Sequence, residues 1–109
     1  MLLDEVPIKA VYLSGPISLG GTASPEQIAI YKSRFRVMAE LIYAEGNLAL
    51  SPLKNEANSW GEYMRKAITQ MMNADSVLML PDWRLSNGAV IEHNLALAIG
   101  IPIEYSDES

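Results

Sequence analysis

Hydrophobic residues are grouped along the chain in two alternating patterns, short continuous runs and longer segments with helical spacing. Continuous apolar runs that end at glycine, proline or polar residues are typical of buried β-strands, and they occupy residues 8–15, 47–53, 75–81 and 101–105. Apolar residues that recur every three or four positions are typical of helices, and this pattern occupies residues 24–45, 60–72 and 88–100. The run at 75–81 is apolar almost throughout, which predicts a strand that is buried on both faces.

The first helical segment carries signals at both ends. Ser24 is expected to be its N-cap, with Pro25 at the first helical position and Gln27 at the capping-box position. Gly46 is expected to stop the helix. The first two helices each have one apolar face, formed by Ile28, Tyr31, Phe35, Met38 and Ile42 on the first and by Trp60, Met64, Ala67, Ile68 and Met71 on the second.

The alternation of strands and helices predicts an α/β fold. Its order, β-α-β-α-β-α-β, favours a parallel sheet of four to five strands with helices on both sides. We therefore expect a flavodoxin-like or Rossmann-like three-layer α-β-α sandwich, a single domain over residues 1–109 with its core at about 8–103 and a short acidic C-terminal tail. Ligands of such sheets bind at the carboxyl ends of the strands, where we expect three loops to meet, at residues 15–23, 51–58 and 81–88.

Composition narrows the classes of function. The chain of 109 residues has a formal net charge of −5, which argues against binding a nucleic-acid polymer, because a phosphate backbone requires a basic surface. No apolar run reaches the roughly 18 residues that a membrane span needs, so no membrane partner is expected. Asp4 and Glu5 stand where a secretion signal would have basic residues, so a cytoplasmic location is expected.

The sequence lacks the usual motifs for metals and cofactors, and we expect neither. With no cysteine and one histidine, it excludes disulfides, thiolate metal sites and histidine-rich metal sites, and no tight acidic cluster invites Mg²⁺. The loop GPISLGGT has Gly15 and Gly20 at the spacing of a P-loop, but Gly21 stands at the lysine position. The dinucleotide fingerprint G-x-G-x-x-G is also missing. The loop is either a flexible connection or a backbone that a ligand approaches closely.

The helical segment at the C-terminal end carries a carboxylate on its apolar face. Glu92 lies three residues after Ala89 and four before Ala96, and Ile99 continues the same face. Such a carboxylate is either paired with a lysine or arginine, left at the helix edge, or placed at a ligand site. The nearby sheet edge and the helix N-terminus, with Ser86 as N-cap and a potential anion site, favour the ligand site. Partial burial there should perturb the pKa of Glu92, as catalytic carboxylates often require.

Several aromatic or imidazole side chains have two possible roles. Tyr12 ends the first strand, where it is either a core residue or a hydrogen-bond partner for a carboxylate at a neighbouring strand end. Trp60 and Trp83 either pack against the protein or stack on a base. His93 follows Glu92 and is expected at the surface.

Three stretches, VYLSGPIS, ADSVLMLPDW and SNGAVIEHNLALAIGIPI, resemble the nucleoside 2-deoxyribosyltransferase superfamily. The similarity covers roughly residues 8 to 103 and is greatest to small phage and prophage proteins of unassigned function. Enzymes of the superfamily have the fold class expected above and cleave the N-glycosidic bond of nucleosides or nucleoside monophosphates. The order and spacing of D-x-x-x-x-L-P-x-W and S-x-G-A-x-x-E make the resemblance quite specific.

The resemblance implies roles for individual residues. Glu92 matches the nucleophile that attacks the anomeric carbon through an oxocarbenium-like transition state, and Tyr12 matches the tyrosine that orients it. Ser86 matches a serine that holds the 5′-phosphate in the nucleotide hydrolases, which favours a monophosphate over a free nucleoside. We expect the substrate-binding residues to be Gly15, Pro16, Ile17, Ser18, Trp83, Ser86, Asn87 and Gly88.

The sequence departs from the superfamily at two positions. The enzymes carry an aspartate on the second helix, eight residues before the aspartate that matches Asp75, and this chain has Ala67 there. That aspartate protonates or positions the leaving base, so its loss should lower the rate by on the order of 10²–10⁴-fold unless another group substitutes. A phosphate-loop serine of the hydrolases is replaced by Pro16, and Ser18 is near enough to stand in.

Three functions fit this sequence. The first is an enzyme that cleaves a nucleoside or nucleotide N-glycosidic bond or transfers the deoxyribosyl group; it requires Glu92 to line a pocket near the Tyr12 hydroxyl. The second is a non-catalytic protein that binds a nucleotide or sugar-phosphate, such as a phage sensing or sequestering factor in the host cytoplasm. The third is a partner-binding protein on a reused fold. The resemblance also implies a homodimer or higher homo-oligomer, with Tyr63, Met71 and Met72 as candidate contacts.

Overall fold

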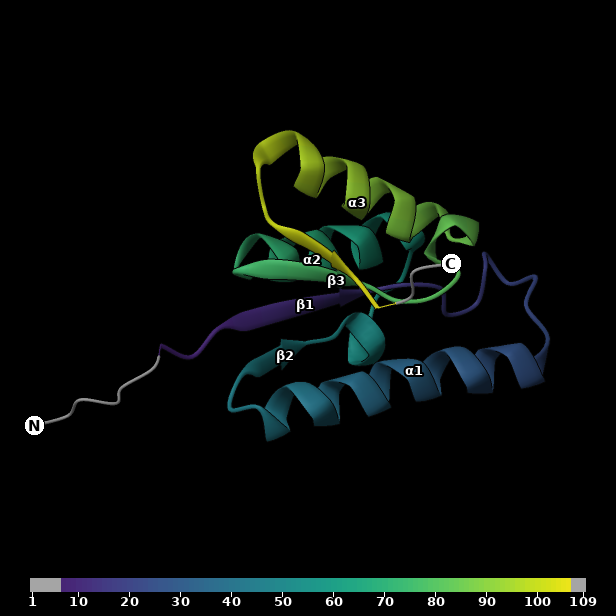
Figure 1. The fold of residues 1–109 in the computed structure, drawn as a ribbon. Coiled ribbons are helices and arrows are strands. Elements are labelled where there is room, and N and C mark those ends of the chain that lie inside the picture. The colour runs from purple at the N-terminus through teal and green to yellow at the C-terminus, as the bar shows by residue number, and fades with distance from the viewer. Residues whose placement is uncertain (1–6, 107–109) are drawn as a thin grey trace, which may run out of the picture.

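The computed structural model describes residues 7–106, in which strands and helices alternate along the chain (Figure 1). The strands are β1 (Ala10–Ser14), β2 (Leu48–Leu50), β3 (Ser76–Met79) and β4 (Ile103–Tyr105). The α-helices are α1 (Pro25–Ala44), α2 (Trp60–Met72) and α3 (Asn87–Ile99), and two short 3₁₀ helices are η1 (Pro52–Lys54) and η2 (Trp83–Leu85). The expectation about a secretion signal, which concerns Asp4 and Glu5, and most of the acidic tail lie outside the described residues.

The strands form one parallel sheet in the order β2-β1-β3-β4. Helix α1 covers one face of this sheet, and α2 and α3 cover the other (Figure 1). The predicted three-layer α-β-α sandwich is therefore confirmed, with four strands. Because β1 and β3 lie side by side at the centre, their carboxyl ends and the loops that follow them meet at one edge of the sheet.

The core consists of two layers, one on each face of the sheet. Successive residues of a strand point to opposite faces, so Tyr12 of β1 packs towards α2 and α3 whereas Leu13 packs towards α1. The layer beneath α2 and α3 contains Tyr12, Ala67, Met71, Val77, Met79, Trp83, Ala89 and Ala96. The layer beneath α1 contains Leu13, Phe35, Ile42, Ala49 and Leu80.

The predicted start of α1 is confirmed in detail. The Ser24 hydroxyl accepts a hydrogen bond from the Gln27 backbone N–H, and the Gln27 side chain accepts one from the Ser24 backbone N–H. This reciprocal pair satisfies two N–H groups that the first helical turn leaves without partners. Gly46 follows the helix with φ +85°, a left-handed conformation that favours glycine.

Some predictions about burial are wrong. Ile99 is 48% exposed at the last position of α3. Trp60 is 58% exposed at the first position of α2. Leu78 of β3 is only half-buried, because α1 packs mainly on β1 and β2. Met71 is fully buried in the core and so has no surface to offer to a second subunit, unlike the exposed Met72.

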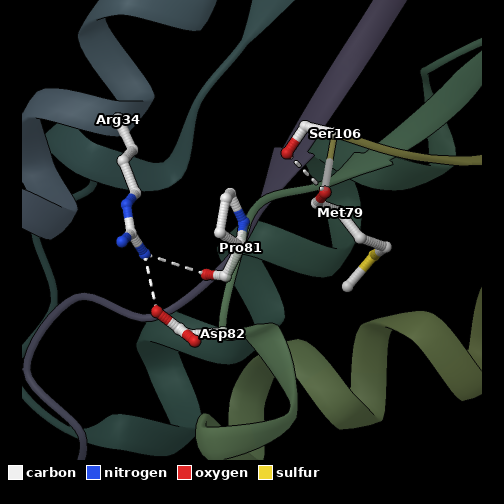
Figure 2. A network of polar contacts seen from close by, with 5 residues as sticks. All are labelled: Arg34, Met79, Pro81, Asp82 and Ser106. Carbon is white, nitrogen blue, oxygen red and sulfur yellow. Dashed lines mark hydrogen bonds and ion pairs between the residues drawn. The ribbon is translucent and has the colours of Figure 1, made fainter. Parts of the chain in front are cut away.

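A small polar network fixes α1 to the turn that follows β3 (Figure 2). The Arg34 guanidinium donates to the Pro81 carbonyl at 3.2 Å and forms an ion pair with Asp82 at 3.0 Å. Nearby, the Ser106 hydroxyl donates to the Met79 carbonyl at 3.1 Å. Asp82 has a left-handed backbone (φ +66°), which aspartate adopts more readily than most residues with a side chain, because its short polar side chain can form local hydrogen bonds.

We expect Gly15→Ala to destabilise the protein by roughly 1–3 kcal/mol, because Gly15 packs so closely against the Leu80 side chain that no room is left for a Cβ atom. A Cβ atom on Gly15 would lie 2.9 Å from the Cβ atom of Leu80, which is itself buried. Gly61→Ala in the first turn of α2 is the matched control, since its nearest obstacle is the flexible end of Arg65 at 3.6 Å. Urea unfolding measures both variants, and equal midpoints for the two would contradict the prediction.

Candidate functional site

Glu92 is a buried carboxylate held by two hydroxyl groups. Its side chain lies on α3 and the residue is only 4% exposed. The Tyr12 hydroxyl donates to its Oε2 atom at 2.8 Å, and the Ser14 hydroxyl donates to its Oε1 atom at 2.6 Å. The contact predicted between Tyr12 and Glu92 is therefore confirmed. Within residues 7–106, the ion pairs are Arg34–Asp82 and Lys66–Glu62, so no lysine or arginine of this part of the chain neutralises Glu92.

Strand geometry explains why two residues of β1 reach the same carboxylate. Tyr12 and Ser14 are two positions apart, so both side chains point to the α3 face of the sheet. Each is fully buried, and each hydroxyl has its partner in Glu92. Ser14 was not predicted from the sequence. The two-residue alternation along β1 points to it, because Ser14 lies on the same face of the strand as Tyr12.

Burial and hydrogen bonding act on Glu92 in opposite directions. Burial raises the pKa of the Glu92 carboxyl above its ordinary value, and the hydrogen bonds from Ser14 and Tyr12 offset part of this rise. Burial, and then the adjacent Glu92 carboxylate, raise the pKa of the Tyr12 hydroxyl well above its ordinary value. Tyr12 therefore keeps its proton and stays a hydrogen-bond donor to the carboxylate.

We expect Ser14→Ala to lower stability by roughly 1–3 kcal/mol, and more at pH 8 than at pH 5. Without this donor the pKa of Glu92 rises further. A raised carboxyl pKa contributes stability that is lost as the pH rises through it, so the deficit grows towards alkaline pH. Ser33→Ala on the exposed side of α1 is the control and should change nothing. Urea unfolding at both pH values is the measurement, and a loss independent of pH would count against the carboxylate as its cause.

A cleft of about 680 Å³ opens beside Glu92 at the carboxyl ends of the strands. Its walls come from the three loops that the sequence predicted, together with the starts of α2 and α3 and one residue of α1. Of the expected substrate-binding residues, those that line it are Gly15, Ile17, Ser18, Ser86, Asn87 and Gly88. The structure thus brings most of the predicted site residues together around a single carboxylate.

Two expected substrate-binding residues do not line the cleft. Pro16 is fully buried within the loop that follows β1. Trp83 is 8% exposed, and its ring stacks on His93 at 4.3 Å between ring centres, with the Arg84 guanidinium 4.5 Å from the Trp83 ring centre. His93, which was expected at the surface, is partly exposed, and its Nε2 atom is hydrogen-bonded to the Tyr105 hydroxyl at 2.7 Å.

The cleft also contains residues that were not predicted from the sequence to bind a substrate. Lys32 of α1 brings a positive charge to its wall, and Tyr63 of α2 brings an aromatic ring. Trp60, for which stacking on a base was one of two expected roles, also lines the cleft. Met64 faces Gly88 so closely that a Cβ atom on Gly88 would lie 3.1 Å from its sulfur. The helical spacing of α2 predicted a core-facing stripe, but Trp60 and Tyr63 at its start line the cleft.

The N-terminus of α3, one turn before Glu92, forms part of the cleft wall. The Ser86 hydroxyl accepts a hydrogen bond from the Ala89 backbone N–H at 3.1 Å, which confirms Ser86 as the N-cap. Glu92 is the only carboxylate that lines the described cleft.

In the part of the chain that the structure covers, no three metal-ligating side chains gather. None of the helices there has the length and apolar character to cross a bilayer.

Ala67 lies in the core and not at the cleft surface. It is fully buried on α2, in the layer that contains Tyr12, Met71 and Val77. A methyl group here neither donates nor accepts a proton. Any acid that assists chemistry in the cleft has to come from another position.

Comparison with known proteins places the site within one protein family. The family model described as Domain of unknown function (DUF4406) matches residues 9–105. This match runs from β1 to the end of β4, so it contains Tyr12, Ser14, Glu92 and every residue that lines the cleft. No curated protein matches the chain.

Proposed function

Since the chain belongs to the DUF4406 family, whose description assigns no activity, we propose a function from the site itself. The protein cleaves the N-glycosidic bond of a nucleoside or nucleoside 5′-monophosphate, by hydrolysis or by deoxyribosyl transfer, with Glu92 as nucleophile. One observation carries the proposal. A carboxylate that no described cation neutralises is buried at the wall of a cleft and fixed by two hydroxyl donors.

The geometry around Glu92 suits attack on an anomeric carbon. Each carboxylate oxygen accepts one hydrogen bond from β1 and keeps a further lone pair for bonding to the sugar. In the proposed reaction a Glu92 oxygen bonds to C1′ while the C1′–N bond breaks and its electron pair leaves with the base. Because burial raises the pKa of Glu92, the carboxylate is a stronger base and nucleophile than one in water.

The other walls of the cleft supply contacts that a nucleotide needs. Its volume falls within the roughly 300–1,000 Å³ of small-molecule sites. Trp60 offers an exposed ring on which a base can stack, and Lys32 offers a positive charge for a phosphate. The similarity to the nucleoside 2-deoxyribosyltransferase superfamily supports the same roles for Glu92, Tyr12 and Ser86.

A second candidate is a protein that binds a nucleotide or sugar-phosphate without cleaving it. Ala67 favours this alternative, because the superfamily has an aspartate there and this chain has a fully buried methyl group. The same cleft serves either function. The two proposals differ only in whether the bound ligand loses its base.

Incubation with a panel of 2′-deoxynucleosides and their 5′-monophosphates separates the two candidates. Chromatography measures free base, and a thermal shift measures binding. Release of base supports the enzyme. A monophosphate that raises the Tm without release of base supports the binding protein. If no compound is cleaved and none changes the Tm, both proposals fail.

We further propose that the protein acts in the cytoplasm as a homodimer or higher homo-oligomer. Large apolar side chains on the outer surfaces of two helices support a contact between copies. They are Ile30, Val37 and Leu41 on α1 and Ile91, Leu97 and Ile99 on α3. Sedimentation of the purified protein tests this part, and a monomer at micromolar concentration would contradict it.

A further inference from the structure

The proposed reaction needs a proton donor that Glu92 does not supply. When the C1′–N bond breaks, its electron pair passes to a nitrogen of the base, and protonation of the base makes it a better leaving group. Glu92 is occupied as the nucleophile, and it accepts hydrogen bonds where a general acid would donate one. The superfamily's aspartate is absent, because Ala67 stands at its position.

Tyr63 lies where such a donor is required. It is on α2 one helical turn before Ala67, so the two residues share a face of the helix, but Tyr63 is close enough to the helix start to face the cleft. Its side chain is half-buried and lines the same cavity as Glu92 and Trp60. No hydrogen bond within residues 7–106 engages the Tyr63 hydroxyl, so it is available to a ligand.

We propose that the Tyr63 hydroxyl is the acid that protonates the leaving base, an inference that rests on the proposed N-glycosidic cleavage. In the first step Glu92 bonds to C1′, the C1′–N bond breaks, and the Tyr63 proton moves to the base. In the second step a water attacks C1′, the bond from C1′ to the Glu92 oxygen breaks, and the water's proton returns to the Tyr63 oxygen. Atoms and charge balance over the cycle, and no further reactant is needed for hydrolysis.

The electrostatics of the cleft support this exchange. Burial, and then the charge of Glu92, raise the pKa of Tyr63 to about 12, so the hydroxyl is protonated in the free protein. When Glu92 becomes a neutral ester of the sugar, its contribution to this rise disappears. The Tyr63 pKa then falls as the base leaves, so the proton becomes easier to donate at the moment it is needed.

Tyr63→Phe tests the proposal when it is assayed on two leaving groups. The four common 2′-deoxynucleoside 5′-monophosphates need protonation, whereas 4-nitrophenyl 2-deoxyriboside 5-phosphate releases a stable anion without it. We expect the variant to lose on the order of 10²–10⁴-fold in base release and to release nitrophenol at nearly the wild-type rate. Tyr43→Phe is the matched control, since its hydroxyl donates to the Ala49 carbonyl away from the cleft.

The possible outcomes separate this inference from the proposed function. An equal loss on both kinds of substrate, or no loss on either, overturns the role of Tyr63. Cleavage by the wild type would in that case still support the proposed N-glycosidic activity. If the wild type releases neither a base nor nitrophenol, the proposed function fails and the role of Tyr63 fails with it. Circular dichroism and the Tm of the variant check that its fold is intact. We expect it to be intact, because the substitution removes one oxygen only.

Discussion

Glu92→Gln removes base release, with an expected loss on the order of 10⁴–10⁶-fold if Glu92 is the nucleophile. The amide has nearly the same shape as the carboxylate, but it carries no charge and does not form the ester with C1′. The amide oxygen can accept from one of the two hydroxyls that donate to Glu92, those of Tyr12 and Ser14, and the amide NH2 can donate to the other, so the cleft should keep its form. Single-turnover assays on the nucleotide panel measure the loss.

The control for this variant makes the same chemical change away from the cleft. Glu104→Gln lies on the exposed edge strand β4 and should release base at the wild-type rate. A monophosphate that raises the Tm of the wild type should still raise that of Glu92→Gln. Near-normal base release by Glu92→Gln would remove Glu92 from the mechanism.

The same variant should show a dependence of stability on pH. Because the pKa of Glu92 is raised from 4.5, the folded wild type loses stability as the pH rises from 4.5 through the raised value. A glutamine has no proton to lose there. We therefore expect Glu92→Gln to melt a few degrees above the wild type at pH 8 and near it below pH 4.5. A difference in Tm that stays constant with pH would show that the buried charge of Glu92 does not cause it.

Ala67→Asp is the substitution with the largest expected effect on stability. It introduces the carboxylate that the nucleoside 2-deoxyribosyltransferase enzymes carry at this position, but Ala67 is fully buried among core residues and faces neither the cleft nor solvent. An unpaired charge buried there should cost roughly 3–5 kcal/mol, a large part of the 5–15 kcal/mol that stabilises a typical domain. We therefore expect partial or complete unfolding at neutral pH and no gain in base release.

Ala67→Asn separates the effect of charge from the effect of volume. Asparagine has the shape of aspartate and no charge, so it should cost less, and its cost should not change with pH. The loss in Ala67→Asp should shrink as acid protonates the carboxyl. Urea unfolding of both variants from pH 4 to pH 8 is the measurement. If Ala67→Asp is as stable as the wild type and releases base faster, the cleft reaches Ala67 and our description of α2 is wrong.

The fold could be predicted closely from the sequence because local signals marked its elements. The capping box at Ser24 and Gln27 fixed the start of α1 to the residue, and the apolar runs placed every strand to within a few positions. The strand order β2-β1-β3-β4 is a tertiary property without such a local signal. The exposure of Leu78 follows from the same property, since it depends on which strands α1 covers.

The site could be predicted only in part. Glu92 was identifiable because a carboxylate interrupts an apolar face, and Tyr12 because the resemblance pairs it with that position. Ser14 is small and lies in a buried strand, so composition gave it no prominence. Tyr63 was expected at a contact between subunits, because helical periodicity alone does not distinguish a cleft from an interface.

The two hydrogen bonds to Glu92 also determine when during folding the site comes into existence. They join residues that are 80 and 78 positions apart, which is most of the chain. A ribosome that has synthesised β1, α1 and β2 has made about half of the cleft, and Glu92 has not yet been synthesised. Contacts of such long range form slowly, because the intervening chain must first be ordered. The site is therefore assembled only when α3 docks on the sheet, so Glu92 and the two hydroxyl groups of β1 meet only in a nearly complete chain.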